Sequence, residues 1–299
     1  MADATPQNFK TGYVAIVGQP NVGKSTLLNH FLNFKVAAVT PKPQTTRHQI
    51  RGILNGEDHQ IIFLDTPGIL EPRYKLQDAM LKAVHRALKE ADVVLFVVEA
   101  AAEPHPKDVA FLEEFLKPKP PWVLAINKMD TVKKHEVLPL IDAYRRFEAL
   151  RAIVPISALK FEGLEELKQE ILAVLPEGPP FYPSDQILDH PERFLVSELI
   201  REKIFQQYGE EIPYSTTVMV EEFREREEQK DYIRAVIYVE RDSQKGILIG
   251  RKGAALKKIG QLAREEIELL LGRPVFLELW VKVREKWSQD ERMLREFGY

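Results

Sequence analysis

The chain has 299 residues, of which 29% are charged, with a net charge of −3 and no cysteine. Its length is sufficient for two hydrophobic cores, because domains cluster at about 100–200 residues. The lack of cysteine excludes disulfides, thiolate zinc clusters and thiol nucleophiles. The small net charge gives no global basic field, so a nucleic-acid partner would have to bind a local basic patch.

No stretch approaches the roughly 18 apolar residues that a membrane-spanning helix needs. Residues 1–5 lack the basic start and apolar core of a signal peptide. We therefore expect the protein to be cytoplasmic.

Short apolar runs recur through the first 175 residues and are separated by amphipathic stretches. The runs span residues 13–17, 61–64, 93–98, 122–126 and 153–156. Continuous hydrophobicity is typical of strands that are covered on both faces of a parallel sheet. Residues 1–175 are therefore predicted to form a doubly wound α/β domain with a mostly parallel sheet.

Proline is concentrated in residues 176–186, and its fixed dihedrals predict a stiff linker. Beyond this linker we expect a helix over 192–207, strands over 215–223, 232–240 and 275–283, and two helices around 250–253. Residues 187–299 are therefore predicted to form a smaller α+β domain that ends in a C-terminal tail.

A glycine-rich loop directly follows the first apolar run, as Gly18-Gln19-Pro20-Asn21-Val22-Gly23-Lys24-Ser25-Thr26. Its glycines let backbone N–H groups point at phosphates, while the next helix presents its positive end. Lys24 would lie between the β- and γ-phosphate oxygens, and the Ser25 hydroxyl would ligate magnesium. The alternative is an ordinary glycine turn, but the place between a strand and a helix favours a phosphate loop.

A second motif, Asp65-Thr66-Pro67-Gly68, follows the second apolar run. Asp65 is expected to hold magnesium through water, and the N–H of Gly68 to approach the γ-phosphate. Alone this motif is a common turn; its distance from the phosphate loop favours the functional interpretation. Ile69 stands where many regulatory GTPases carry a glutamine that orients the attacking water, so we expect slow intrinsic hydrolysis.

The sensor threonine should lie between the two motifs, and the segment Gln44-Thr45-Thr46-Arg47-His48 is the candidate. Thr46 is predicted to close on magnesium when the γ-phosphate is present. Two alternatives stay open: Thr45 has this role, or both threonines belong to a solvated loop. The predicted magnesium ligands are thus Ser25, Thr46 and Asp65.

The string Asn127-Lys128-Met129-Asp130 predicts recognition of guanine. An ionised Asp130 would accept hydrogen bonds from guanine N1–H and N2, whereas adenine offers an acceptor at the first position. Ser157-Ala158 would add a backbone donor to the guanine oxygen. A phosphate-loop kinase or ATPase shares only the first motif, so this string argues for GTP and against ATP.

A second glycine loop, Ile249-Gly250-Arg251-Lys252-Gly253, lies in a window of residues 241–264 that contains seven basic residues and one acid. The pattern strand, helix, glycine loop, helix, strand is that of a KH module, in which the loop backbone approaches single-stranded RNA. An ordinary helix–helix turn and a KH-like protein-docking surface are the alternatives. The predicted RNA-binding residues are Ile249, Gly250, Arg251, Lys252, Gly253, Lys257 and Lys258.

Together these strings resemble the Era family of GTPases over essentially the whole chain. The resemblance implies a P-loop GTPase domain followed by a type II KH domain, with GTP or GDP and Mg²⁺ as cofactors. It also implies a GTPase that binds the 3′ end of small-subunit ribosomal RNA, assists assembly of that subunit and associates in part with the inner membrane surface. We expect the protein to be a monomer. The family carries a hydrophobic residue where Ile69 stands, and related GTPases use the residue matching Asn21 to bind K⁺.

Two rival functions differ in what they need. A constitutive RNA-binding protein with a merely structural GDP site would show no turnover. A GTPase that signals at a lipid surface would need an anchoring helix, and none is evident.

Overall fold

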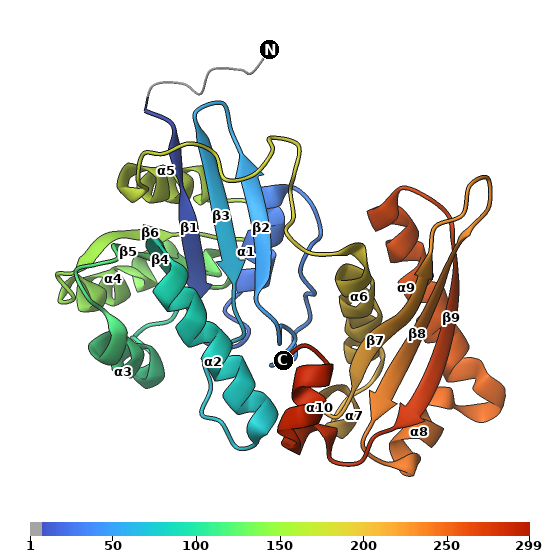
Figure 1. Cartoon of the computed structure of the whole chain (residues 1–299). Helices are drawn as coiled ribbons and strands as arrows, with labels where there is room; N and C mark the ends of the chain where they lie inside the picture. Colours follow the sequence, from blue (N-terminus) through green and yellow to red (C-terminus); the bar gives the residue numbers. More distant parts are fainter. Residues whose placement is uncertain (1–7) are drawn as a thin grey trace. The chain divides into compact units, whose positions relative to one another are not determined.

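The computed structural model describes residues 8–299, so the expectation for residues 1–5 lies outside the described part. The chain divides into two compact units, shown with the sequence colours in Figure 1. The first unit contains the residues up to Ala37, Thr46–Glu71 and Met80–Asp189, and the second contains Ala38–Thr45, Pro72–Ala79 and His190–Tyr299. No helix within residues 8–299 is long and apolar enough to cross a membrane.

The first unit is built on a six-stranded sheet in the order β2-β3-β1-β4-β5-β6. Its strands are β1 (Lys10–Val17), β2 (Ile50–Asn55), β3 (His59–Asp65), β4 (Val93–Glu99), β5 (Trp122–Asn127) and β6 (Leu150–Pro155). All neighbours pair in parallel except β2, which pairs antiparallel with β3. The mostly parallel doubly wound sheet that the apolar runs predict is confirmed, although the edge strand β2 was not predicted.

Helices cover both faces of this sheet, which explains why its strands are continuously apolar. Residues of α2 (Lys75–Glu90), α3 (Pro106–Phe115) and α4 (Leu138–Arg145) share one buried cluster with alternate residues of β1, β3, β4 and β5. On the other face, α1 (Lys24–Leu32) buries Leu27 and Leu28, and α5 (Leu164–Val174) buries Leu167 and Ile171 (Figure 1).

The proline-rich segment 176–186 packs along the first unit. The carbonyl of Pro176 accepts from Thr11 N–H at 3.0 Å, and the Gly178 N–H donates to the Phe9 carbonyl at 2.9 Å. Farther on, the Ile53 N–H donates to the Ile187 carbonyl at 2.9 Å. By contacts the chain divides between Asp189 and His190, while a functional boundary at 176–186 stays a prediction.

The second unit has the KH layout of helix, strand, strand, helix, helix, strand. These elements are α6 (Glu192–Gln207), β7 (Thr217–Arg224), β8 (Asp231–Val239), α8 (Asp242–Ile249), α9 (Ala254–Leu271) and β9 (Val275–Val283). β7 pairs antiparallel and β9 parallel with β8, which confirms the predicted type II arrangement. Residues of α6, α8 and α9 bury one face of this sheet in a common core.

Four further helices complete this unit: α7 (Glu211–Tyr214), the short helix η3 (Arg251–Gly253) and, after the last strand, the short helix η4 (Trp287–Gln289) and α10 (Glu291–Glu296). The predicted C-terminal tail is thus partly helical, and Asp290 caps α10 by accepting from the N–H groups of Arg292 and Met293.

Candidate functional site

The phosphate loop takes a backbone form that needs glycine at two positions. Gly18 and Gly23 have φ of +152° and +99°. A Cβ on Gly23 would stand 2.2 Å from the side-chain nitrogen of Asn127, Nδ2. Asn21 also has positive φ, at 65°. The loop therefore curls from the end of β1 into α1 and has the conformation from which backbone N–H groups cradle phosphate.

Lys24 is buried at the start of α1, and its ammonium donates to the carbonyls of Gly18 and Gln19 at 3.0 and 2.8 Å. Burial lowers the pKa of Lys24 to about 8, although the nearby carboxylates of Asp65 and Asp108 favour its charged form. The ammonium thus lies inside the loop, where a bound phosphate would further stabilise its charge.

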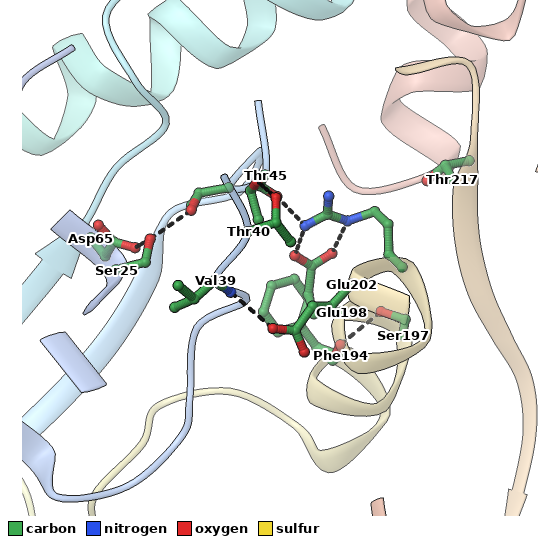
Figure 2. A network of polar contacts seen from close by, with 12 residues as sticks. Ser25, Val39, Thr40, Thr45, Asp65, Phe194, Ser197, Glu198, Glu202 and Thr217 are labelled. Atoms are coloured by element: carbon green, nitrogen blue, oxygen red, sulfur yellow. Dashed lines mark hydrogen bonds and ion pairs between the residues drawn. The ribbon is translucent and has the colours of Figure 1, made fainter. Parts of the chain in front are cut away.

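The three predicted magnesium ligands come together. The Ser25 hydroxyl donates to Asp65 Oδ2 at 2.7 Å (Figure 2). It also lies 2.8 Å from the Thr46 hydroxyl. Asp65 is fully buried, and its other oxygen, Oδ1, has no hydrogen-bond partner among the described residues. Burial raises the pKa of Asp65 to about 6, although Lys24 and the Ser25 hydroxyl favour its ionised form.

This donor set fits magnesium. Mg²⁺ takes oxygen ligands, keeps several waters and usually needs only one or two carboxylates besides substrate phosphates. Within residues 8–299 no group of three histidine, aspartate or glutamate side chains could hold a metal. Two hydroxyls, one buried carboxylate with an available oxygen and incoming phosphate oxygens would complete the coordination.

Of the two candidate threonines, Thr46 lies at this site and Thr45 does not. The Thr45 hydroxyl lies 2.6 Å from that of Thr40 and donates to the Lys42 carbonyl at 2.7 Å. Of the other predicted switch residues, Gln44 accepts from the Tyr74 hydroxyl at 3.1 Å, Arg47 is buried and His48 is half-buried.

The Asp65–Ile69 segment packs against the phosphate loop. The Ile69 N–H donates to the Gly18 carbonyl at 3.0 Å, and a Cβ on Gly68 would stand 2.6 Å from the backbone of Pro20. Thr66 donates to the Ile16 carbonyl at 2.8 Å. A glycine is therefore required at position 68 because the two loops touch there.

Asn127 connects the phosphate loop to the Ser157-Ala158 loop of the predicted guanine site. Its side-chain amide donates to the Val22 carbonyl at 2.7 Å and accepts from the Ala158 N–H at 2.9 Å. Asp130 is exposed, and one of its oxygens accepts from the buried Ser157 hydroxyl. Lys128 has φ of 65° and pairs with Glu99 at 2.7 Å. The five predicted residues therefore gather at the ends of β5 and β6.

Sequence reasoning missed Asp108, which lies on α3 and is 3% exposed. Its carboxylate accepts from Gln19 Nε2 at 2.9 Å and thereby fixes the outer side of the phosphate loop. Burial raises the pKa of Asp108, while the Gln19 hydrogen bond, His105 and Lys24 oppose the rise. No motif marks this position, because the contact joins residues that lie 89 positions apart.

In the second unit, the glycine loop lies between α8 and α9. Gly250 and Gly253 have φ of +69° and +77°, and Lys252 between them has φ of 53°. A Cβ on Gly250 would stand 2.6 Å from that of Ala255, whereas Gly253 faces open space. Arg251 and Lys252 are exposed, so the loop presents its backbone and two cations to solvent.

Beside this loop a groove of about 460 Å³ runs between α9 and β9. Its lining combines apolar side chains with a basic and polar rim: Gly253, Leu256, Lys257, Gly260, Gln261, Arg264, Leu277 and Leu279. Of the predicted RNA-binding residues, Gly253 and Lys257 line the groove, whereas Lys258 is exposed outside its lining. The sequence marked the glycine loop, but which leucines form the apolar walls of the groove could be seen only in the structure.

These two sites on these two folds define a GTPase of the phosphate-loop class joined to a KH domain. Family models agree: residues 13–128 match the model described as 50S ribosome-binding GTPase, and residues 211–288 match the KH domain. The chain is 49% identical over 295 residues to the GTPase Era of Geotalea uraniireducens, in a match that covers 99% of both chains. It belongs to the Era family of GTPases.

Two solved structures are similar along almost the whole length. A single-substitution variant of Aquifex aeolicus Era, bound to GDP·AlF₄⁻, is 46% identical with a TM-score of 0.94, covering 97% of this chain and 99% of that one. Era in complex with MgGDPNP and nucleotides 1506–1542 of 16S ribosomal RNA has a TM-score of 0.93 at the same identity and coverage.

Proposed function

We propose that this protein is a GTP-hydrolysing switch that binds the single-stranded 3′ end of small-subunit ribosomal RNA and assists assembly of that subunit. The observation that carries the RNA part is the groove beside Gly253, which combines apolar walls for bases with Lys257 and Arg264 for the phosphate backbone. The bound RNA of the similar Era structure supports the same target.

In the nucleotide site, Lys24 and the loop N–H groups bind the phosphates, and Ser25, Thr46 and Asp65 hold Mg²⁺. Asp130 reads the guanine edge, while Asn127 holds the phosphate loop and the Ser157-Ala158 loop together. GTP with Mg²⁺ orders the Thr46 segment and the Asp65–Gly68 segment, and hydrolysis releases them. The MgGDPNP and GDP·AlF₄⁻ complexes of the similar Era structures support these cofactors.

The test is binding of a fluorescent 3′-end fragment of 16S ribosomal RNA to the full chain with GTP analogue, GDP or no nucleotide. We expect tighter binding in one nucleotide state, because a ligand shifts an equilibrium only by its differential affinity. The double variant K257A/R264A should weaken binding by about tenfold or more. Its control is R292A/R295A, which removes the same charge from exposed positions of α10.

Identical RNA affinity in all three states, together with turnover at background, would instead indicate a constitutive RNA-binding protein with a structural nucleotide. Loss of RNA binding in R292A/R295A as large as in K257A/R264A would assign binding to overall charge rather than to the groove.

A cytoplasmic location, a monomeric state and peripheral contact with the inner membrane surface also belong to this proposal. The location is the expectation from the sequence, and the membrane contact rests on the family resemblance. Flotation with anionic vesicles at physiological salt tests the membrane contact, and light scattering tests the monomer.

A further inference from the structure

The segment Ala38–Thr45 belongs to the second unit and is held by α6 at three places along its length. The Val39 N–H donates to Glu202 Oε1 at 3.0 Å. Lys42 donates to the carbonyls of Phe205 and Tyr208 at the C-terminal end of α6. The guanidinium of Arg201 donates to the Thr45 carbonyl; the contacts of Val39, Thr45, Glu198 and Glu202 are drawn in Figure 2.

The α6 side chains that make these contacts are buried charges. Arg201 and Glu202 are each 1% exposed, and Glu198, which pairs with Arg201 through two hydrogen bonds, is 5% exposed. Burying a charge is costly unless it is paired and hydrogen-bonded. A bidentate arginine–carboxylate pair fixes the guanidinium plane, so the donor that faces the Thr45 carbonyl has a defined direction.

Arg201 contacts the residue that directly precedes Thr46, the proposed magnesium ligand. The Thr45 carbonyl oxygen and the nitrogen and Cα of Thr46 lie in one rigid plane, because the peptide bond does not rotate. A hold on that oxygen therefore restricts where the Thr46 Cα can lie. From that position the Thr46 hydroxyl reaches to 2.8 Å from Ser25 Oγ.

Lys203, the next cation along α6 after Arg201, contacts α9. The ammonium of Lys203 pairs with Glu266 on α9 and lies 3.5 Å from Glu202. α9 begins at Ala254 and lines the groove with Leu256 and Arg264. Neighbouring residues of α6 thus contact the segment Ala38–Thr45 and α9, the helix that lines the groove.

We propose that Arg201 is a positioning residue for the sensor threonine: it holds the peptide unit between Thr45 and Thr46 so that Thr46 can close on magnesium. Glu202 and Lys42 fix the rest of the segment. The inference rests on the proposed magnesium role of Thr46.

The experiment measures the dissociation constants of a fluorescent GTP analogue and of GDP, with Mg²⁺, for the full chain and its variants. Thr46 would ligate magnesium only with the γ-phosphate present, so the preference for GTP analogue over GDP should fall while GDP affinity stays unchanged. For R201M we expect the preference to fall by about tenfold, the effect of losing one hydrogen bond to a charged group. R201K, which keeps a donor, should retain most of the wild-type preference. K42M should lose less of the preference than R201M.

Two variants serve as controls for fold and position. R193M removes an exposed arginine from the same helix, and it should leave the preference unchanged. R201M removes the cation that compensates the buried charge of Glu198, so R201M/E198Q removes both charges and tests the same contact if R201M unfolds. Thermal unfolding of each variant accompanies the binding data.

T46A distinguishes a failure of the inference about Arg201 from a failure of the proposed magnesium role of Thr46. If T46A lowers the preference but R201M/E198Q and K42M keep the wild-type value, the inference about Arg201 is wrong and the role of Thr46 stands. If T46A itself keeps the wild-type preference, the proposed magnesium role of Thr46 is wrong, and the inference is wrong with it.

Discussion

The hydroxyl oxygens of Ser25 and Thr46 lie 2.8 Å apart, although the two residues are 21 positions apart in the chain. Ser25 belongs to α1, whereas Thr46 belongs to a segment without helix or strand. The pair therefore joins a helix to a segment outside the regular secondary structure, which is the kind of segment that a γ-phosphate orders in GTPases.

The first prediction compares T46A with T45A. T46A removes a hydroxyl from the proposed magnesium site, so we expect the turnover number to fall by about tenfold or more, since the metal stabilises charge in the transition state. T45A removes only the contacts to Thr40 and Lys42 and keeps the carbonyl that Arg201 binds. Single-turnover GTP hydrolysis measures both, and a larger loss in T45A would reverse the assignment.

The second prediction separates N127A from D130A. N127A leaves the buried Val22 carbonyl and Ala158 N–H without their partners, so the free energy of unfolding should fall by about 2–3 kcal/mol. D130A removes an exposed carboxylate that accepts from the buried Ser157 hydroxyl, so it should lower the free energy of unfolding by only about 1 kcal/mol. GTP affinity should nevertheless fall by about a hundredfold in D130A, because two hydrogen bonds to a charged group are lost.

Chemical denaturation and nucleotide competition measure these two effects. ATP should compete better against GTP in D130A than in the wild type. A D130A variant that still rejects ATP as strongly as the wild type would show that the base is read elsewhere.

Much of this site could be predicted because each motif directly follows a buried strand. Asp65 ends β3 and Asn127 ends β5, so the apolar runs place both at the carboxyl edge of one sheet. The bounds of α6 and β9 also agree with the sequence-based expectation, and a proline, Pro191 or Pro274, directly precedes each element.

Contacts between distant residues could not be predicted in this way. The edge strand β2 is short and carries Arg51 and Gly52, so its pattern does not stand out from a loop. Asp108 faces the phosphate loop only because α3 packs on the sheet next to it, and no local signal reports that packing. For the same reason the sequence did not reveal that residues 38–45 pack with α6.

The third prediction concerns pH. Burial raises the pKa of Asp108 in the folded protein, so between its unfolded and folded pKa values the native state binds more protons than the unfolded state. This group's contribution therefore makes the fold less stable as pH rises through that window. D108N keeps an acceptor for Gln19 and should be more stable than the wild type at pH 7.5, with the difference shrinking towards pH 4.

Urea denaturation at several pH values measures this difference. The control is D142N, which changes an exposed aspartate paired with Arg145 on the surface. A stability difference between D108N and the wild type that is independent of pH would contradict the assignment to Asp108 ionisation.

The fourth prediction is that turnover is several-fold faster in potassium than in sodium buffer. Asn21 lies in the phosphate loop with φ of 65°, where a side-chain oxygen can help to hold a monovalent cation beside the phosphates. N21G removes this oxygen and keeps a residue that tolerates positive φ. Equal rates in the two buffers, or a potassium effect that survives in N21G, would argue against this cation site.

The last prediction distinguishes the two glycines of the groove loop. In G250A the new Cβ would meet that of Ala255 at 2.6 Å, so both crowding and positive φ should destabilise the second unit, by about 2–4 kcal/mol together. In G253A the new Cβ would have no other atom within 4 Å, so only the positive φ should destabilise the second unit, by about 1–2 kcal/mol. G253A should nevertheless weaken RNA binding, because its methyl group projects where the RNA backbone approaches the loop. Thermal unfolding and RNA anisotropy, measured on the same samples, check both effects: G253A should lose more affinity than stability, and the opposite order would place the RNA backbone away from this loop.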